Sequence, residues 1–382
     1  MNKKSKETHC VHFFGDKPYD SQGINTPIEP SSAFKYGDGK NNVYPRYFNT
    51  HNQNVVNSKI AALEGGESSL IFSSGMAAIT TALFSLLNKG DHAVFYSELY
   101  GGTFNLLISE FEKKGIKYSI VNQQNEEEFS KVIRPETKII YFESPTNPLL
   151  SIVDISLIVD IAKKHDIISL IDNTFASPIN QNPIAFGVDV VIHSGTKYLG
   201  GHSDLCFGAI VSTDKIINKI HKTAINLGGN LNPFDCYLIE RSIKTLDVRV
   251  KRHNENALAI AQFLHGHDKV KNVFYPGLES HIGFEIAKKQ MLGFGGMLSF
   301  ELTTENQEKI IEFLDTLKLV TKALSLGGVE SSICSPALTS HIKMNREERM
   351  EIGITDGLLR LSVGIENVED LKADFENALK IV

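Results

Sequence analysis

The sequence has little cysteine and no spacing that would give its cysteines a structural role. Four of them, Cys10, Cys206, Cys236 and Cys334, are spread over 382 residues without a C-x-x-C pair. This pattern offers neither a disulfide framework nor a zinc site, and it is typical of a reducing cytosol. The segment His9-Cys10-Val11-His12 contains metal-binding residue types but lacks further clustered ligands, so we expect no metal site.

The chain also has no excess of positive charge and no long apolar run. Its 39 basic and 45 acidic residues give a net charge of −6, which argues against a broad surface for nucleic acid. No run is long enough to span a membrane, and MNKKSKETHC lacks the apolar core of a signal peptide. With 42% hydrophobic and 22% charged residues, we expect a cytoplasmic globular protein that binds neither membrane nor nucleic acid.

The composition and the hydrophobic periodicity of the sequence divide the chain into three regions. Residues 1–50 are rich in Pro, Gly, Asn and Tyr and predict an extended arm. Residues 51–248 alternate helices with short continuous apolar strands, which predicts an α/β domain with a mostly parallel central sheet. Residues 249–382 mix strands and helices and predict a smaller C-terminal α+β domain.

Regular elements are expected throughout the last two regions. In the α/β region we expect strands at 68–74, 92–97, 137–144, 167–174 and 189–194, and helices at 75–87 and 155–165. In the C-terminal region we expect strands at 295–302 and 358–364, and helices at 249–266, 306–318 and 368–382.

Polar residues follow the carboxyl ends of the five strands of the α/β region, where open α/β sheets bind their ligands. The groups are Ser74-Gly75-Met76, Tyr100-Gly101-Gly102, Thr146-Asn147, Asp172-Asn173-Thr174 and Ser194-Gly195-Thr196-Lys197. Lys197 is the one amine among them. A lysine desolvated at such a strand end has a lowered pKa and can form a Schiff base with an aldehyde, although most lysines are surface residues.

Two further features complete a chemical pattern. The helix start at Gly75 offers N–H groups to a phosphate, or it is a plain turn, since G-x-G-x-x-G and G-x-x-x-x-G-K-[ST] are both absent. Asp172 could pair with a protonated pyridine nitrogen, or it could cap the next segment. A phosphate-binding helix start, a carboxylate for a pyridine nitrogen and a lysine that can form a Schiff base together indicate a site for pyridoxal 5′-phosphate (PLP).

Neighbouring residues have a place in this pattern as well. Ser194 and Thr196 could donate hydroxyl groups to the phosphate. Tyr100 could stack on the pyridine ring or pack under its own loop. Asn147 could donate to the phenolate oxygen of the ring, or it is a turn residue beside Pro148.

Six strings occur in order along nearly the whole chain: FSSGMAAI, ELYGGT, ESPTNPLL, IDNTFASP, HSGTKYLGGHSD and LLRLSVGIE. With these strings the chain resembles the Cys/Met-metabolism PLP enzymes, the transsulfuration family of fold-type I. That family includes cystathionine γ-synthase, cystathionine γ- and β-lyases, and methionine γ-lyase. The resemblance implies an aspartate-aminotransferase-like fold and a homotetramer made of two tight dimers that share their active sites.

The resemblance also implies roles for individual residues. Lys197 is then the Schiff-base lysine and proton carrier, and Tyr100 is the stacking and catalytic tyrosine. Further residues implied at the cofactor are Asp172, Gly75, Met76, Ser194, Thr196, Asn147 and Thr174, with Tyr44 and Arg46 reaching the neighbouring subunit's phosphate. Arg360 holds the substrate carboxylate as a bidentate fork, helped by Asn147 and Ser325. Leu324 faces the distal part of the substrate or packs into the core.

The chain departs from the family pattern at three places, and two of these departures leave the substrate open. The arm reads Tyr44-Pro45-Arg46-Tyr47-Phe48-Asn49-Thr50-His51 where the family pattern resembles Y-S-R-x-x-N-P-T. Gly102 replaces the cysteine typical of methionine γ-lyases, whereas Leu324 replaces the glutamate frequent in cystathionine γ-enzymes. These last two departures point in opposite directions.

Rival classes fit the sequence less well. Ser194-Gly195-Thr196-Lys197 matches the S-x-x-K pattern of serine acylases, but K-T-G is absent and Ser203-Asp204-Leu205 replaces S-D-N. A non-enzymatic binding protein would not need Lys197, Asp172 and Arg360 together. We therefore expect a PLP enzyme acting at Cγ of sulfur amino acids or homoserine esters. Cystathionine γ-lyase or γ-synthase leads, and methionine or homocysteine γ-lyase and cystathionine β-lyase are the alternatives.

Overall fold

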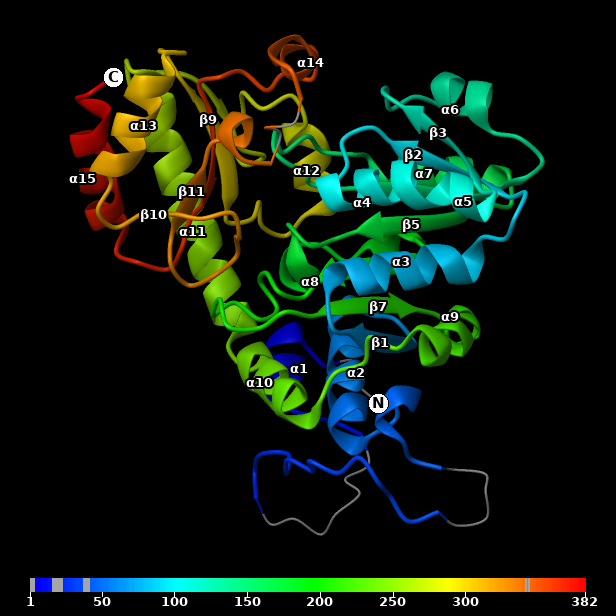
Figure 1. The fold of residues 1–382 in the computed structure, drawn as a ribbon. Coiled ribbons are helices and arrows are strands. Elements are labelled where there is room, and N and C mark those ends of the chain that lie inside the picture. The colour runs from blue at the N-terminus through cyan, green and yellow to red at the C-terminus, as the bar shows by residue number, and fades with distance from the viewer. Residues whose placement is uncertain (1–3, 16–22, 37–41, 341, 343) are drawn as a thin grey trace.

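Two sheets in consecutive regions of the chain organise the fold, as the ribbon in Figure 1 shows. The computed structural model describes residues 4–15, 23–36, 42–340, 342 and 344–382. Within that part of the chain, no helix is long and apolar enough to cross a membrane.

The larger sheet has seven strands in the order β1-β7-β6-β5-β4-β2-β3. They are β1 (Ser68–Phe72), β2 (His92–Tyr96), β3 (Lys117–Val121), β4 (Thr137–Glu143), β5 (Ile168–Asp172), β6 (Val190–Ser194) and β7 (Gly208–Ser212). The pairs from β3 to β6 are parallel, and β7 runs antiparallel to both β6 and β1. The mostly parallel sheet is therefore confirmed. The expected strands omit β3, whose half-exposed edge position gives no continuous apolar run, and they also omit β7.

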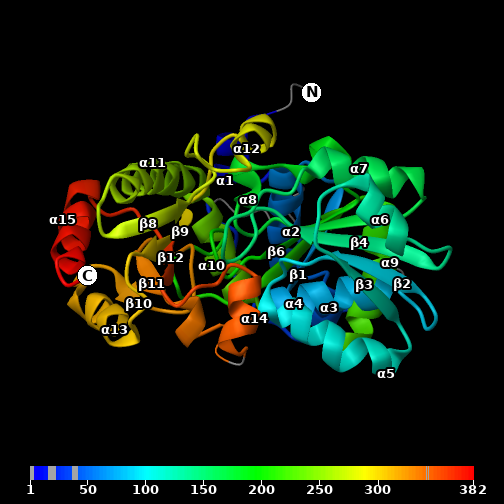
Figure 2. The ribbon, with the colours of Figure 1, turned by 90° about the horizontal axis from the view of Figure 1, so that it is seen from above.

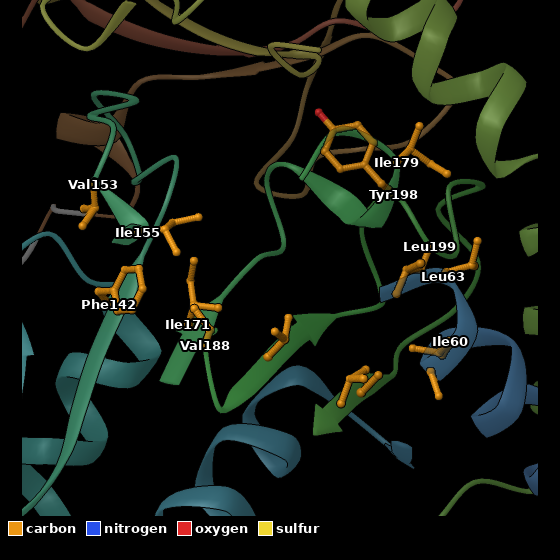
Figure 3. Packing of buried hydrophobic residues seen from close by; sticks show 14 of the residues in the cluster. Ile60, Leu63, Phe142, Val153, Ile155, Ile171, Ile179, Val188, Tyr198 and Leu199 are labelled. Atoms are coloured by element: carbon orange, nitrogen blue, oxygen red, sulfur yellow. The ribbon is translucent and has the colours of Figure 1, made fainter. Parts of the chain in front are cut away.

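Helices cover both faces of this sheet. They are α2 (His51–Glu64), α3 (Gly75–Leu86), α4 (Gly101–Leu106), α5 (Glu112–Lys114), α6 (Glu126–Val132), α7 (Ile155–Lys164), α8 (Ser177–Asn180), α9 (Asp214–Leu227) and α10 (Pro233–Ile243). Successive strand residues enter opposite cores: Tyr141 lies in one apolar cluster and Phe142 in the other. Figure 3 shows the second cluster, where Phe142 and Ile171 of adjacent strands share a core with Ile60 of α2. Burial on both faces explains why the strands read as continuous apolar runs.

The smaller sheet lies in the C-terminal region and has the order β10-β11-β12-β9-β8. Its strands are β8 (Val270–Phe274), β9 (Met297–Leu302), β10 (Thr321–Lys322), β11 (Ser332–Cys334) and β12 (Leu358–Ser362). Three helices, α11 (Leu246–His265), α13 (Gln307–Thr316) and α15 (Val368–Leu379), form a core with it around Phe300, Phe313 and Phe375. Figure 2 shows this layer beside the larger sheet. The short helices α12 (Phe284–Gln290) and α14 (Arg346–Glu351) complete the region.

The predicted boundary after residue 248 falls within the first turn of α11, the helix that leads from the larger sheet to the smaller one. The α+β character expected of residues 249–382 agrees with the strands and helices found there.

The extended arm expected for residues 1–50 is wrong for its first part, because α1 (Lys6–Val11) is a helix docked on the protein. The Lys6 ammonium donates to the carbonyls of Pro178 (2.6 Å) and Ile179 (3.1 Å), and the buried Lys59 donates to the Cys10 carbonyl (3.0 Å). The thiol-bearing side chain of Cys10 is fully buried in the core. Segments 16–22 and 37–41 of the arm lie outside the described residues.

A buried carboxylate ties α2 to the strand ends. Glu64, the last residue of α2, is 1% exposed and accepts hydrogen bonds from His193 Nε2 (2.5 Å), Asn173 Nδ2 (2.8 Å) and Asn182 Nδ2 (3.4 Å). Asn173 and His193 belong to the segments that end in the candidate site. Because a buried charge needs such partners, this cluster holds the segments of Asn173 and His193 in place below the candidate site.

We predict that Glu64→Ala lowers the free energy of unfolding by about 3–5 kcal/mol, because it leaves buried donors unpaired. Urea denaturation followed by circular dichroism measures the change. Glu126→Ala is the matched control, since Glu126 forms an exposed ion pair with Lys164 and its loss should barely change the free energy of unfolding. Equal effects in the two variants would contradict a stabilising role for the Glu64 cluster.

Candidate active site

The carboxyl ends of five strands meet at one edge of the larger sheet. β1, β2, β4, β5 and β6 run in the same direction, since β1 and β6 are both antiparallel to β7. The polar groups expected to converge are therefore gathered at this edge. Residues of the smaller sheet reach the same place, as the contacts of Lys197 and Asn147 show below.

Lys197 lies in the turn that follows β6, partly buried between the two sheets. Its backbone N–H donates to the Ser194 carbonyl (3.2 Å), and its carbonyl accepts from the Gly201 N–H (2.7 Å). Its Nζ donates to Ser325 Oγ at 3.3 Å. Burial, followed by the positive charge of Arg360, lowers the pKa of the Lys197 ammonium. A larger share of neutral amine makes this lysine a better nucleophile toward an aldehyde.

Asp172 ends β5 and is 8% exposed. Its Oδ1 accepts from the Thr174 N–H (3.0 Å) and from the Thr174 hydroxyl, whose oxygen in turn accepts from the Ser194 N–H (2.8 Å). Both hydrogen bonds found for this carboxylate in the described part of the chain end on Oδ1, which leaves Oδ2 for a cationic donor. The capping role considered for Asp172 is not found, because Ala176 has the N-cap position of the next helix, α8, and the bond from the Thr174 N–H closes a local turn instead.

The start of α3 has the properties of an anion site. Ser74 caps the helix by accepting from the Ala77 N–H (3.0 Å), whereas the N–H groups of Gly75 and Met76 bond no acceptor among the residues that the structure describes. A side chain at Gly75 would lie 2.9 Å from Ser194 Oγ, so this hydroxyl faces the same helix end. Two unpaired N–H groups at a helix N-terminus suit a phosphate.

The hydroxyl of Thr196 lies differently from what its expected role requires. Its Oγ1 accepts from the Phe207 N–H (3.1 Å) and donates to the Phe207 carbonyl (3.2 Å). This pair of bonds joins the lysine turn to the start of β7. A bond from Thr196 to the phosphate stays a prediction, and it would have to compete with the Phe207 carbonyl for the hydroxyl proton.

Tyr100 caps the start of α4, and its side chain is 48% exposed. A side chain at Gly102 would lie 2.5 Å from the Tyr100 ring and 2.9 Å from the Met76 sulfur, so the ring and the thioether both lie against this glycine. The Tyr100 N–H donates to Glu143 Oε1 at 2.7 Å. An exposed aromatic face with a fixed main chain suits stacking on a planar ring.

Arg360 lies in β12 and is 6% exposed. Its guanidinium donates to Asn147 Oδ1 (3.0 Å) and to the Leu324 carbonyl (2.9 Å). A buried, always charged guanidinium beside the lysine suits a carboxylate ligand. Asn147, Ser325 and Leu324 are thus brought together around Arg360 and Lys197.

The side chain of Leu324 is 66% exposed, so the structure contradicts the alternative in which it packs into the core. It lines a cavity of about 290 Å³ together with apolar residues of α13 and the segment after β11. The cavity is lined by Ile311, Leu314, Lys322, Ala323, Leu324, Ile333, Cys334, Ser335, Leu338 and Thr339.

Within one chain, Tyr44 and Arg46 lie beside Tyr47 and the last turn of α9. Arg46 donates to the Ile225 carbonyl at the end of α9, and its guanidinium lies 5.7 Å and 5.4 Å from the ring centres of Tyr44 and Tyr47. The described residues show no hydrogen bond from either residue to Gly75, Asp172 or Lys197 of the same chain.

Two residues of the site were missed by sequence reasoning. Glu143 accepts a hydrogen bond from the main chain of Tyr100. The sequence feature that could have indicated it is its position as the last residue of an apolar strand, at the start of the ESPTNPLL string. Gly327, at φ +75°, lies against the lysine turn: a side chain there would be 2.9 Å from the Tyr198 nitrogen and 3.1 Å from the Lys197 carbonyl carbon. Its signal was the glycine pair in SLGG.

The site combines the Lys197 amine, the hydrogen-bonded Asp172 carboxylate and the open N-terminus of α3 with a buried guanidinium. Together these groups define an α/β enzyme with a site for a phosphorylated aldehyde cofactor. The chain belongs to the Cys/Met metabolism PLP-dependent enzyme family, whose sequence profile matches residues 7–380. PLP is accordingly its cofactor, and the residues at the strand ends fit that group: N–H donors for a phosphate, a carboxylate for a ring nitrogen and an amine for an aldehyde.

Comparisons with individual proteins agree with the family. The chain is 47% identical to a cystathionine beta-lyase of Lactococcus lactis subsp. cremoris (strain MG1363), over 98% of this chain and 99% of the relative. It is 44% identical to a cystathionine gamma-lyase of Bacillus subtilis (strain 168), again over 98% and 99%. Its fold matches a cystathionine gamma synthase from Xanthomonas oryzae pv. oryzae, solved in complex with aminoacrylate and cysteine. That match has a TM-score of 0.94 and 38% identity and covers 99% of this chain and 98% of the other.

We predict that Gly327→Ala lowers kcat/KM by at least about tenfold, because a methyl group at positive φ must push against the backbone of Lys197. The free energy of unfolding should fall by about 1–3 kcal/mol. Gly90→Ala is the control, since Gly90 has a similar φ of +95° but nothing within 4 Å of its added methyl group. Equal activity of the two variants would show that the Lys197 backbone does not depend on this contact.

Proposed function

We propose that this protein cleaves or exchanges a C–S or C–O bond at Cγ of a sulfur amino acid or homoserine ester, as a cystathionine γ-lyase or γ-synthase does. One observation carries the proposal: the Arg360 guanidinium lies beside Lys197. Ser325 Oγ accepts a hydrogen bond from Lys197 Nζ, and the Leu324 carbonyl accepts one from Arg360. This arrangement can hold an amino acid by its carboxylate with its α-carbon next to an amine that moves protons.

The chain's own residues would hold the cofactor at three points. The N–H groups of Gly75 and Met76, with Ser194 Oγ, would hold the phosphate, and Asp172 Oδ2 would accept from the ring nitrogen. Tyr100 would cover one face of the ring. When bound, PLP supplies an electron sink for the negative charge that develops at the substrate's Cα.

Lys197 is the proton carrier in this proposal. Because burial and Arg360 lower its pKa, a larger share of its amine is neutral and can take a proton from the substrate's Cα. Once it had passed this first proton on to the bound cofactor, the amine would be neutral again and could remove a second proton, at Cβ, which permits loss of a group from Cγ. Ser325 Oγ, which accepts from Nζ, orients the amine between these positions. Arg360 and Asn147 keep the carboxylate in place throughout.

A β-elimination on cystathionine is the second candidate. It is favoured by the relative of 47% identity, which is a cystathionine beta-lyase. A β-elimination needs the first of the two proton removals but not the second, so the same residues can serve it. The two reactions differ in which carbon loses sulfur, and hence in whether cysteine or homocysteine is released.

The test is a product assay with purified protein and PLP over L-cystathionine, O-acetyl- or O-succinylhomoserine plus cysteine, L-methionine and L-homocysteine. Release of cysteine and 2-oxobutyrate from cystathionine, or formation of cystathionine from the ester, supports the proposal. Homocysteine and pyruvate from cystathionine support the second candidate. Lys197→Ala is the control and should lose more than about 10²–10⁴-fold in turnover. No reaction with any of these substrates would overturn both candidates.

We also propose that the protein works in the cytoplasm as a homotetramer of two tight dimers, with Tyr44 and Arg46 completing the phosphate site of the neighbouring subunit. In support, the described residues show no hydrogen bond from either one to Gly75, Asp172 or Lys197 of the same chain, and Tyr44 is 42% exposed. The thiols of Cys10, Cys206, Cys236 and Cys334 are all free, in keeping with a reducing compartment.

We predict that mixing Lys197→Ala chains with Arg46→Ala chains restores activity. A mixed dimer has one site with a native lysine from one chain and a native arginine from the other, so random exchange should restore about one quarter of the native sites. Activity is measured after subunit exchange has been verified by native mass spectrometry. Exchange without any rescue would mean that Arg46 serves its own chain.

We predict that Arg360→Lys reduces kcat/KM by at least about tenfold while PLP stays bound, because lysine lacks the planar fork and a charge-assisted bond is worth about 1.5–3 kcal/mol. The visible absorbance of bound PLP verifies cofactor content. Unchanged kcat/KM in the loaded variant would place the substrate carboxylate elsewhere.

We predict that Leu324→Glu raises kcat/KM for cystathionine relative to homocysteine by up to about tenfold. The exposed side chain points away from the core, and a carboxylate there can pair with the distal ammonium of cystathionine, a gain of about 1 kcal/mol. Leu319→Glu, another half-exposed leucine of the same region, is the control. An unchanged substrate ratio would mean that position 324 does not face the substrate.

A further inference from the structure

The larger sheet carries a buried acid at the site that the mechanism above does not use. Glu143 is the last residue of β4 and is 6% exposed. Its Oε1 accepts from the Tyr100 N–H at 2.7 Å, across a separation of 43 residues. A carboxyl group taken out of water at a strand end needs a reason to be there.

Glu143 and Asp172 form a pair on neighbouring parallel strands. The two residues are register partners, as are Phe142 and Ile171 just before them. Phe142 and Ile171 point into the core in Figure 3, so alternation along the strands turns Glu143 and Asp172 toward the opposite face. Two carboxyl groups side by side in a buried position do not both ionise readily.

The surroundings decide which of the two carries the charge. Burial, followed by the charge of Asp172, raises the pKa of Glu143 well above its usual range. Burial also raises the pKa of Asp172, but the donors of Thr174, followed by the charges of His193 and Lys197, act against this rise. Of the two carboxyl groups, Glu143 is therefore the one driven more strongly toward its neutral form.

A neutral acid at position 143 still offers an acceptor to Tyr100. The Tyr100 N–H lies at the start of α4, and the ring of the same residue lies against Gly102 and Met76. Anchoring this N–H to the sheet fixes where the exposed ring can lie. The bond thus joins the tyrosine loop to the strand next to Asp172.

We propose that Glu143 is a positioning residue for PLP, which fixes the main chain of Tyr100 against the sheet at the strand end next to Asp172. The inference rests on the proposed function, because it takes Tyr100 and Asp172 as cofactor contacts. It adds a role for the length of a side chain that touches neither cofactor nor substrate.

Two substitutions separate reach from charge. Glu143→Gln keeps an acceptor oxygen at the same distance and is always neutral, so it should bind PLP within about twofold of the native protein. Glu143→Asp keeps the acid but is one methylene shorter and cannot reach the Tyr100 N–H, so it should bind PLP about 3- to 10-fold more weakly. Glu301→Gln is the matched control. Glu301 is a buried carboxyl group of β9 that accepts from Thr355 Oγ1 (2.7 Å), and its substitution should leave PLP affinity unchanged.

The readouts are the PLP dissociation constant, measured by equilibrium dialysis, and the circular dichroism band of bound PLP, which reports the asymmetry of the aromatic face. We expect a native band in Glu143→Gln and a weakened band in Glu143→Asp. Weak binding in the glutamine variant, or native binding and band in the aspartate variant, would overturn the inference. If the aspartate variant does not fold, the glutamine variant decides the question by itself. Native protein that takes up no PLP would overturn the proposed function as well.

Discussion

The parallel register of β4, β5 and β6 is the constraint on which the rest of the site depends. It places Glu143 beside Asp172 and Asp172 beside Ile192, so that the lysine turn begins one strand away from the carboxylate. A slip of one residue would turn Asp172 into the core. The Thr174 hydroxyl, which links Asp172 to the Ser194 N–H, continues the connection past the last ladder bond.

Burial then determines the charges at this edge. It lowers the pKa of Lys197 and raises that of Glu143, so an amine and a carboxyl group are both driven toward their neutral forms. Asp172 and Arg360 are stabilised by donors and acceptors around them. A site with one neutral base, one anion and one fixed cation can bind an amino acid and move its protons without large rearrangement.

The two sheets contribute unequal parts. The larger sheet supplies Lys197 and Asp172, whereas the smaller one supplies Arg360 and the Leu324–Ser325 segment. Direct bonds between the regions keep them aligned: Ser299 Oγ donates to the Pro148 carbonyl (2.6 Å), and Gln290 accepts from the Ile155 N–H (3.2 Å). Rigid elements on both sides hold the Arg360 fork at a fixed distance from the lysine.

The sequence by itself determined the larger strands and helices, because apolar runs of strand length between helices predict a covered parallel sheet. It also determined Lys197, Asp172 and Gly75 as candidates, since polar groups after such strands must meet at one edge. It did not reveal β7, the docked α1 or Glu143, because their partners lie far away along the chain. Only the tertiary structure decided that Thr196 bonds Phe207, that Leu324 is exposed and that Arg46 bonds the Ile225 carbonyl. Each of these outcomes depends on contacts between distant segments, which local pattern does not encode.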